Sequence, residues 1–216
     1  MGLPDKEQIK KAKQETPWDF SNKILYDLCR NNDLHNKDEI ILTKVLFIGR
    51  IYAAAVERRR NKKDEINDDF YIKTIIPTFK KSELDRHLEK LKNFDKITIS
   101  NIPDILEAHH YLTSILKNIT KLNKRSFSSK YLHFHLPELF FMFDNRVVTA
   151  LRQFISRIPE DLKHVMKLKN IDNEYANFFC KCFDLKRQME NYYNMTLSNR
   201  QFDNLLIKIA NQQNNA

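Results

Sequence analysis

Lys130 and Asp144 are the residues of this sequence whose types and spacing suggest a reaction. They lie fourteen positions apart and flank a largely apolar stretch that is interrupted by Pro137. A lysine amine can attack a sugar carbon, and a carboxylate can stabilise the cation that forms when a base leaves the sugar. Such a pair would suit an enzyme that cleaves bases from nucleic acid. The same two residues would also fit an ordinary helix lysine and an ordinary helix cap.

The segments around this pair are expected to be helices joined by a tight turn. Apolar residues recur at helical spacing after a start signal at Pro103. A turn over residues 123 to 126 follows, and a second helix should stop before Pro137, because a proline disfavours the helical conformation of the residue before it. Asp144 is then placed to cap a third helix. The sequence therefore predicts a helix-turn-helix unit over about residues 104 to 158.

Basic and hydroxyl side chains gather around this turn. The amides of a turn and of a helix N-terminus offer donors and partial positive charge to a phosphate, and hydroxyls suit contacts with the DNA backbone. In the alternative interpretation the serines only cap a helix, and the basic run after residue 57 only complements a helix C-terminus. The candidates for DNA contact are Lys121, Lys124, Arg125, Ser126, Ser128, Ser129 and Arg146, with the basic run Arg58, Arg59 and Arg60.

Aromatic residues near the pair are candidates for a base pocket. We name Tyr131, His133 and Phe143, because an aromatic ring in such a pocket would stack on a flipped base. Packing in the core is the competing interpretation for each of them.

No metal site and no cofactor are expected. His133 and His135 would point about 200° apart on a helix, which makes them poor partners for one metal ion. The three cysteines are too few for a four-cysteine centre. The two glycines, Gly2 and Gly49, lack the neighbours that phosphate-binding nucleotide loops need, which argues against ATP and NAD chemistry.

The charge of the chain favours a polyanionic partner. Its 37 Lys and Arg residues exceed its 28 Asp and Glu residues, and the net charge is +9. Binding to DNA with release of counterions would follow from such an excess. The competing explanation is a genome that simply encodes many lysines.

The fold class is predicted to be all-α. The chain has 42% hydrophobic residues and few glycines, and its apolar residues recur at helical spacing, so we expect one globular domain over residues 1–216 with about eight or nine helices. The Asn- and Gln-rich tail, residues 211–216, is expected to fray. No apolar window of about 18 residues exists, and the N-terminus lacks an apolar signal core. We expect a cytoplasmic monomer that is neither secreted nor inserted into a membrane.

The order of these features resembles the helix-hairpin-helix DNA glycosylase superfamily. That family joins two helices by a hairpin that grips a DNA phosphate, carries a lysine on the second helix in its lyase members, and caps the next helix with an essential aspartate. Residues 122 to 129 resemble the hairpin, Lys130 the lysine and Asp144 the aspartate.

Three features depart from the family pattern. The family hairpin carries two glycines in a Leu-Pro-Gly-x-Gly pattern, whereas this chain has no glycine after Gly49. The interval from Lys130 to Asp144 is several residues shorter than in typical lyase members, and a four-cysteine cluster is missing.

The resemblance implies a DNA glycosylase that flips a damaged or modified base out of double-stranded DNA and cleaves its glycosidic bond. The enzyme would be monofunctional or would also have AP-lyase activity. It would serve repair or defence against phage with hypermodified DNA, and the sequence does not indicate which base it removes. Two alternatives from other classes are a non-catalytic helical DNA-binding module and a helical adaptor protein.

Overall fold

The chain is helical throughout the part that the structure describes. A computed structural model describes residues 2–59 and 66–214, and within them it contains eleven α-helices, one π-helical turn, one 3₁₀ helix and no strand. This confirms the all-α prediction, with more helices than the eight or nine expected. Arg60, a candidate for DNA contact, lies outside the described residues.

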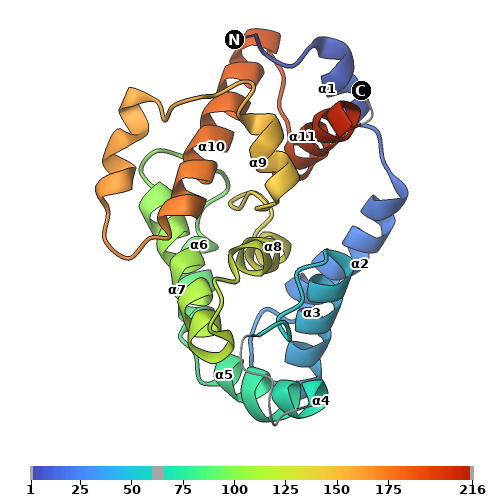
Figure 1. Cartoon of the computed structure of the whole chain (residues 1–216), viewed down its shortest axis with the longest axis vertical. Coiled ribbons are helices and arrows are strands. Elements are labelled where there is room, and N and C mark those ends of the chain that lie inside the picture. The colour runs from blue at the N-terminus through green and yellow to red at the C-terminus, as the bar shows by residue number, and fades with distance from the viewer. Residues whose placement is uncertain (1, 60–65, 215–216) are drawn as a thin grey trace.

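Figure 1 shows the order of the helices along the chain. They are α1 (Lys6–Ala12), α2 (Pro17–Asn31), α3 (Asp38–Ile51), α4 (Asn67–Phe70), the π turn (Tyr71–Ile75), α5 (Ile76–Lys80), α6 (Leu84–Leu91), α7 (Ile102–Thr120), α8 (Arg125–His135), α9 (Asn145–Leu151), the 3₁₀ helix (Glu160–Lys167), α10 (Asn173–Tyr193) and α11 (Asn199–Asn214).

Local capping interactions start several of these helices. Thr16 and Asp19 form a capping box at the start of α2, with Pro17 as its first residue. Ser198 and Gln201 bond to each other's backbone amides at the start of α11. These starts depend on neighbours within three residues, which is why the sequence alone indicates them.

Helix α3 ends earlier than its apolar pattern predicts. The alternative interpretation of the basic run after residue 57 requires a helix that ends there, but α3 stops at Ile51, and Ala53 adopts a left-handed conformation with φ 51°. The chain then folds back, so that a Cβ on Gly49 would lie 3.3 Å from the Cα of Ala55. The small residue Gly49 accommodates both the chain's own reversal and the neighbouring helix α8, because the Phe127 ring would lie 3.7 Å from the same Cβ. Arg58 does not lie at a helix C-terminus.

Residues 96 to 101 contain a bend and a turn and lead into α7. One further local prediction differs from the structure. The tail expected to fray from residue 211 is helical through Asn214.

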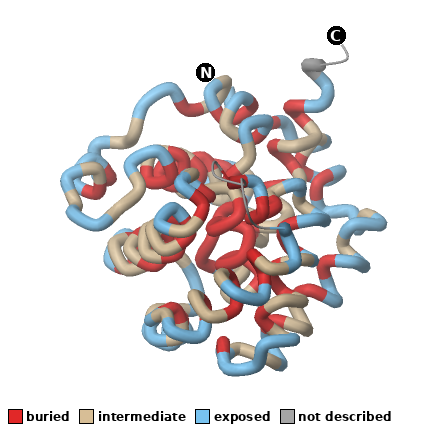
Figure 2. Tube along the Cα trace, turned by 60° about the horizontal axis from the view of Figure 1, so that its bottom comes forward, coloured by how far each residue is buried: buried red, intermediate tan, exposed pale blue. Residues whose placement is uncertain are grey.

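Helix α8 lies at the centre of the molecule. It packs against α2, α3 and α7, whereas α9 packs against α10 and α11, and α1 packs against α11 (Figure 1). Every residue from Phe127 to Phe134 is buried, and buried positions fill the middle of the trace in Figure 2. The polar side chains of α8 therefore have to find partners inside the protein.

Candidate functional site

Asp144 is the N-cap residue of α9. Its Oδ1 accepts hydrogen bonds from the Arg146 backbone amide at 2.9 Å and from Arg146 Nε at 3.2 Å. Partial burial opposes ionisation of the carboxyl, but the Arg146 amide and the Lys130 ammonium outweigh it and lower the Asp144 pKa. The predicted cap is confirmed, and it presents an ionised carboxylate that is 24% exposed.

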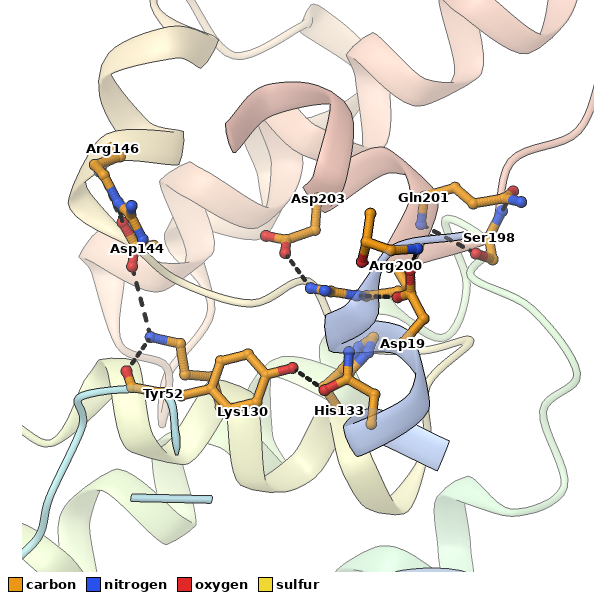
Figure 3. Close-up of polar contacts among 12 residues, drawn as sticks. Asp19, Tyr52, Lys130, His133, Asp144, Arg146, Ser198, Arg200, Gln201 and Asp203 are labelled. Carbon is orange, nitrogen blue, oxygen red and sulfur yellow. Dashed lines mark hydrogen bonds and ion pairs between the residues drawn. The ribbon is translucent and has the colours of Figure 1, made fainter. Parts of the chain in front are cut away.

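Lys130 extends from the buried helix α8 toward this carboxylate (Figure 3). Its Nζ lies 3.7 Å from Asp144 Oδ2, donates to Ser126 Oγ at 2.9 Å, and contacts the Tyr52 carbonyl oxygen at 3.4 Å. Burial lowers the pKa of Lys130, and the negative charge of Asp144 partly opposes that shift. The structure thus brings together the two residues named first from the sequence.

A second carboxylate, Asp203 on α11, belongs to the same cluster. It is buried, and its Oδ2 accepts from Arg200 at 3.0 Å. Burial raises the pKa of Asp203 to about 6, while Arg200 and Lys130 act in the opposite direction. Arg200 also bonds to Asp19 of α2 through its Nε at 3.3 Å (Figure 3).

Sequence reasoning missed Asp203 because it lies outside the expected helix-turn-helix unit. One signal was present: Asp203 sits next to Phe202 and one turn before Leu206, both of which are buried, so a lone acid occupies the apolar side of α11. An acid in that position needs a charged partner inside the fold.

Two basic residues at the turn, Lys124 and Arg125, bind other groups of the protein. The turn itself spans residues 121 to 124, two residues earlier than predicted. The buried Lys124 ammonium donates to the backbone carbonyls of Ala55 and Arg58. Arg125 pairs with Asp172 at 2.7 Å and with Glu174 at 2.8 Å. Both residues therefore hold the turn against neighbouring segments, which corrects their assignment as phosphate contacts.

Lys121 shows how the turn forms without glycine. It adopts the left-handed conformation with φ 58°, a conformation that costs a residue with a Cβ about 1 kcal/mol and that glycine adopts freely. Its side chain is exposed, and its Nζ donates to the Asn118 carbonyl at 2.6 Å.

Two serines of α8, Ser126 and Ser129, form hydrogen bonds with other residues of the protein. Ser128 and Ser129 are fully buried, so a direct phosphate contact is closed to them in this structure, contrary to prediction. Ser129 Oγ accepts from the backbone amide of Phe143 at 2.8 Å and thereby fixes the chain directly before Asp144. Ser126 accepts from Lys130, so it also serves the cluster.

Arg58 and Arg59, the described residues of the basic run, differ in exposure. Arg58 is exposed. Arg59 is buried, with its guanidinium 4.1 Å from the centre of the Phe70 ring and bonded to Asn67, so it is a structural residue and not the predicted phosphate contact. Exposed cations at the turn are Arg58, Lys117 and Lys121, and Arg146 is exposed beside Asp144.

All three residues predicted for a base pocket are buried. Tyr131 is fully buried, with its hydroxyl 2.7 Å from His35 Nε2. His133 is fully buried between the Phe140 carbonyl and the Tyr26 hydroxyl, and burial lowers its pKa to about 4. Neither ring is accessible from the surface in this structure. Phe143 also packs in the core, but it lines a groove beside α9 and α10 as well.

Within residues 2–59 and 66–214, no three His, Cys, Asp or Glu side chains converge in a way that could hold a metal ion. No helix in this described part combines the length and the apolar composition needed to cross a bilayer. The three cysteines are buried and unpaired.

Comparison of the chain with protein-family models, with curated proteins and with solved structures gave no match.

Proposed function

We propose that this protein is a DNA glycosylase that uses Asp144 and Lys130 to release a base from DNA. The observation that carries the proposal is the position of the Lys130 ammonium, which is buried yet 3.7 Å from a carboxylate that reaches the surface. Asp144 occupies the N-cap that the family resemblance predicts for the reacting aspartate. Exposed cations close to the turn and the net charge of +9 would attract the DNA backbone.

In the monofunctional version of the reaction, water is the nucleophile. The bond between the base nitrogen and C1′ breaks, and its electron pair leaves with the base, which takes up a proton. The oxygen of a water molecule bonds to C1′ and releases a proton. The ionised Asp144 stabilises the positive charge that develops on the sugar, as carboxylates do in glycoside hydrolysis. Lys130 then orients Asp144 or holds a phosphate.

In the lyase version, the neutral amine of Lys130 attacks C1′ and displaces the base. The new C–N bond forms as the bond to the base breaks, and the nitrogen then loses a proton. The ring oxygen leaves with its electron pair and takes up a proton as the C1′=N bond of a Schiff base forms. Burial supports this version, because it lowers the pKa of Lys130 and raises the fraction of neutral amine at neutral pH.

The decisive experiment is a screen for abasic sites in normal, damaged and naturally hypermodified DNA. Asp144→Asn should reduce base release at least about 100-fold, as expected when a charge that stabilises the transition state is lost. It should leave folding and DNA affinity intact, since asparagine is also a good N-cap. Asp5→Asn, at the N-cap of α1, is the matched control and should be fully active. Equal activity of Asp144→Asn and the native protein would refute the proposal.

The second candidate function is a non-catalytic helical DNA-binding module. It is favoured by the contacts of Lys130 with Ser126 and the Tyr52 carbonyl, which give the ammonium a purely structural role. A binding module would retain salt-dependent DNA affinity and release no base from any DNA in the screen. For a helical adaptor, DNA affinity would be absent or insensitive to salt.

A further inference from the structure

A groove of about 530 Å³ lies between α9, the 3₁₀ helix and the first half of α10. Its volume falls within the range of small-molecule sites. Five apolar side chains line it: Phe143, Val148, Leu151, Met166 and Phe178. The groove borders the same helix that Asp144 caps, and its lining runs from Phe143, directly before that cap, to Arg152, directly after the last residue of the helix. Asp144 itself is not among the lining residues.

Two cations line this groove. Arg152 follows the last residue of α9, and Lys181 lies on α10. Among the described residues, neither side chain makes an ion pair or a hydrogen bond. Burial lowers the pKa of Lys181, and the like charge of Arg152 adds to that effect. The acid that also lines the groove, Glu174, is held by Arg125 at 2.8 Å.

Two carboxamides complete the polar lining. Asn173 and Asn177 lie one turn apart on α10, so both face the same side of the helix. In the part of the chain that the structure describes, neither side chain makes a hydrogen bond. Each therefore offers donors and an acceptor to a ligand.

We propose that this groove binds a small aromatic anion of the nucleoside monophosphate class. The planar ring packs on the apolar floor beside Phe178, and the anionic group lies between Arg152 and Lys181. An arginine fork and a lysine ammonium are suited to phosphate oxygens. The anion removes the repulsion between two cations that have no acidic partner of their own. The amides of Asn173 and Asn177 then meet the polar edge of the ring.

Isothermal titration of the full chain with deoxyguanosine monophosphate, deoxyguanosine and inorganic phosphate tests this proposal. Deoxyguanosine monophosphate should bind with a Kd of about 1 mM or tighter. Deoxyguanosine and phosphate alone should each bind at least about tenfold more weakly, because each lacks one half of the recognised chemistry. The proposal fails if the monophosphate shows no binding at millimolar concentration, or if either fragment binds as well as the whole.

Substitutions locate the site. Arg152→Gln and Lys181→Gln should each weaken the monophosphate at least about tenfold. Arg157→Gln, which removes an exposed arginine outside the groove lining, is the charge-matched control and should bind as the native protein does. Native affinity in the Arg152→Gln and Lys181→Gln proteins would overturn the assignment. Asp144→Asn should keep full affinity, so this inference stands or falls independently of the proposed glycosylase activity.

Discussion

Helix α8 supplies side chains to two polar clusters that differ in how completely their groups are paired. Around Tyr131, the buried tyrosine hydroxyl meets His35 Nε2 at 2.7 Å, and His35 Nδ1 meets the carboxylate of Asp85. Around Lys130, the ammonium lies 3.7 Å from Asp144, and the second carboxylate, Asp203, is bonded to Arg200. The first cluster is a chain of close donor and acceptor contacts.

The difference suggests which cluster can do chemistry. In the His35 cluster each group has a close partner, and burial lowers the pKa of His35, which favours its neutral form. A substrate would have to break contacts that the fold needs. In the Lys130 cluster the ammonium and the Asp144 carboxylate are farther apart, and the carboxylate is partly exposed. A substrate can therefore contact Asp144 without breaking a contact in the core.

The largest expected effect is on covalent trapping at Lys130. If the lyase version holds, borohydride should trap the native protein on DNA that contains the target base, and Lys130→Met should give no adduct, because the thioether cannot form a Schiff base. Gel electrophoresis of the reduced mixture measures the adduct, and circular dichroism checks the fold. An adduct that persists in Lys130→Met would exclude this lysine as the nucleophile. A native protein that releases base without any adduct would be monofunctional.

The His35 cluster should instead respond in stability. His35→Ala removes the partner of both Tyr131 and Asp85 and leaves a cavity, so the free energy of unfolding should fall by about 3 kcal/mol or more. Urea denaturation measures the loss. His164→Ala, at an exposed position of the 3₁₀ helix, is the control. A loss below about 1 kcal/mol would contradict the structural role given to this cluster.

Asp203 should make the Lys130 cluster sensitive to pH. Its raised pKa of about 6 means that the folded state favours the neutral carboxyl. That contribution to stability is full below the ordinary pKa of 3.8 and is lost as the pH rises through about 6. Asp203→Asn cannot ionise, so its stability relative to the native protein should rise between pH 4 and pH 7, by on the order of 2 kcal/mol. A difference that stays constant over this interval in urea denaturation would contradict the assignment.

The smallest expected effect concerns the surface beside the turn. Lys121→Gln should weaken binding to all DNA sequences alike and reduce the slope of log affinity against log salt by about 1, because one phosphate contact is lost. Fluorescence anisotropy over a series of salt concentrations measures the slope. Lys23→Gln, an exposed change on α2, should leave the slope unchanged. An unchanged slope in Lys121→Gln would remove this lysine from the DNA-binding surface.

Features fixed by near neighbours in the sequence were predictable. The starts of α2, α9 and α11 follow from Thr16, Asp144 and Ser198, because a capping side chain meets an amide within three residues. The all-helical class follows from helical periodicity and the near absence of glycine. The approach of Lys130 to Asp144 agrees with what the family resemblance implies for this pair.

Features that depend on distant partners were not predictable. The polar residues of α8 suggested a face toward DNA, yet Ser129 binds the Phe143 amide and His133 binds Tyr26 of α2. Asp203 joins the cluster only because α11 packs against α9. Such contacts follow from the packing of whole helices, which the local pattern of a single sequence does not determine.

The packing of α1 against α11 has a consequence for the order of folding. The Tyr193 hydroxyl donates to the Pro4 carbonyl, and Lys208 donates to the Lys11 carbonyl, so these contacts join segments from nearly opposite ends of the chain. Contacts of such long sequence separation carry a large loop-closure cost, whereas helices form quickly from local contacts. Because α11 also supplies Asp203 and Arg200, a refolding molecule should regain its helical circular dichroism before the charged cluster is complete.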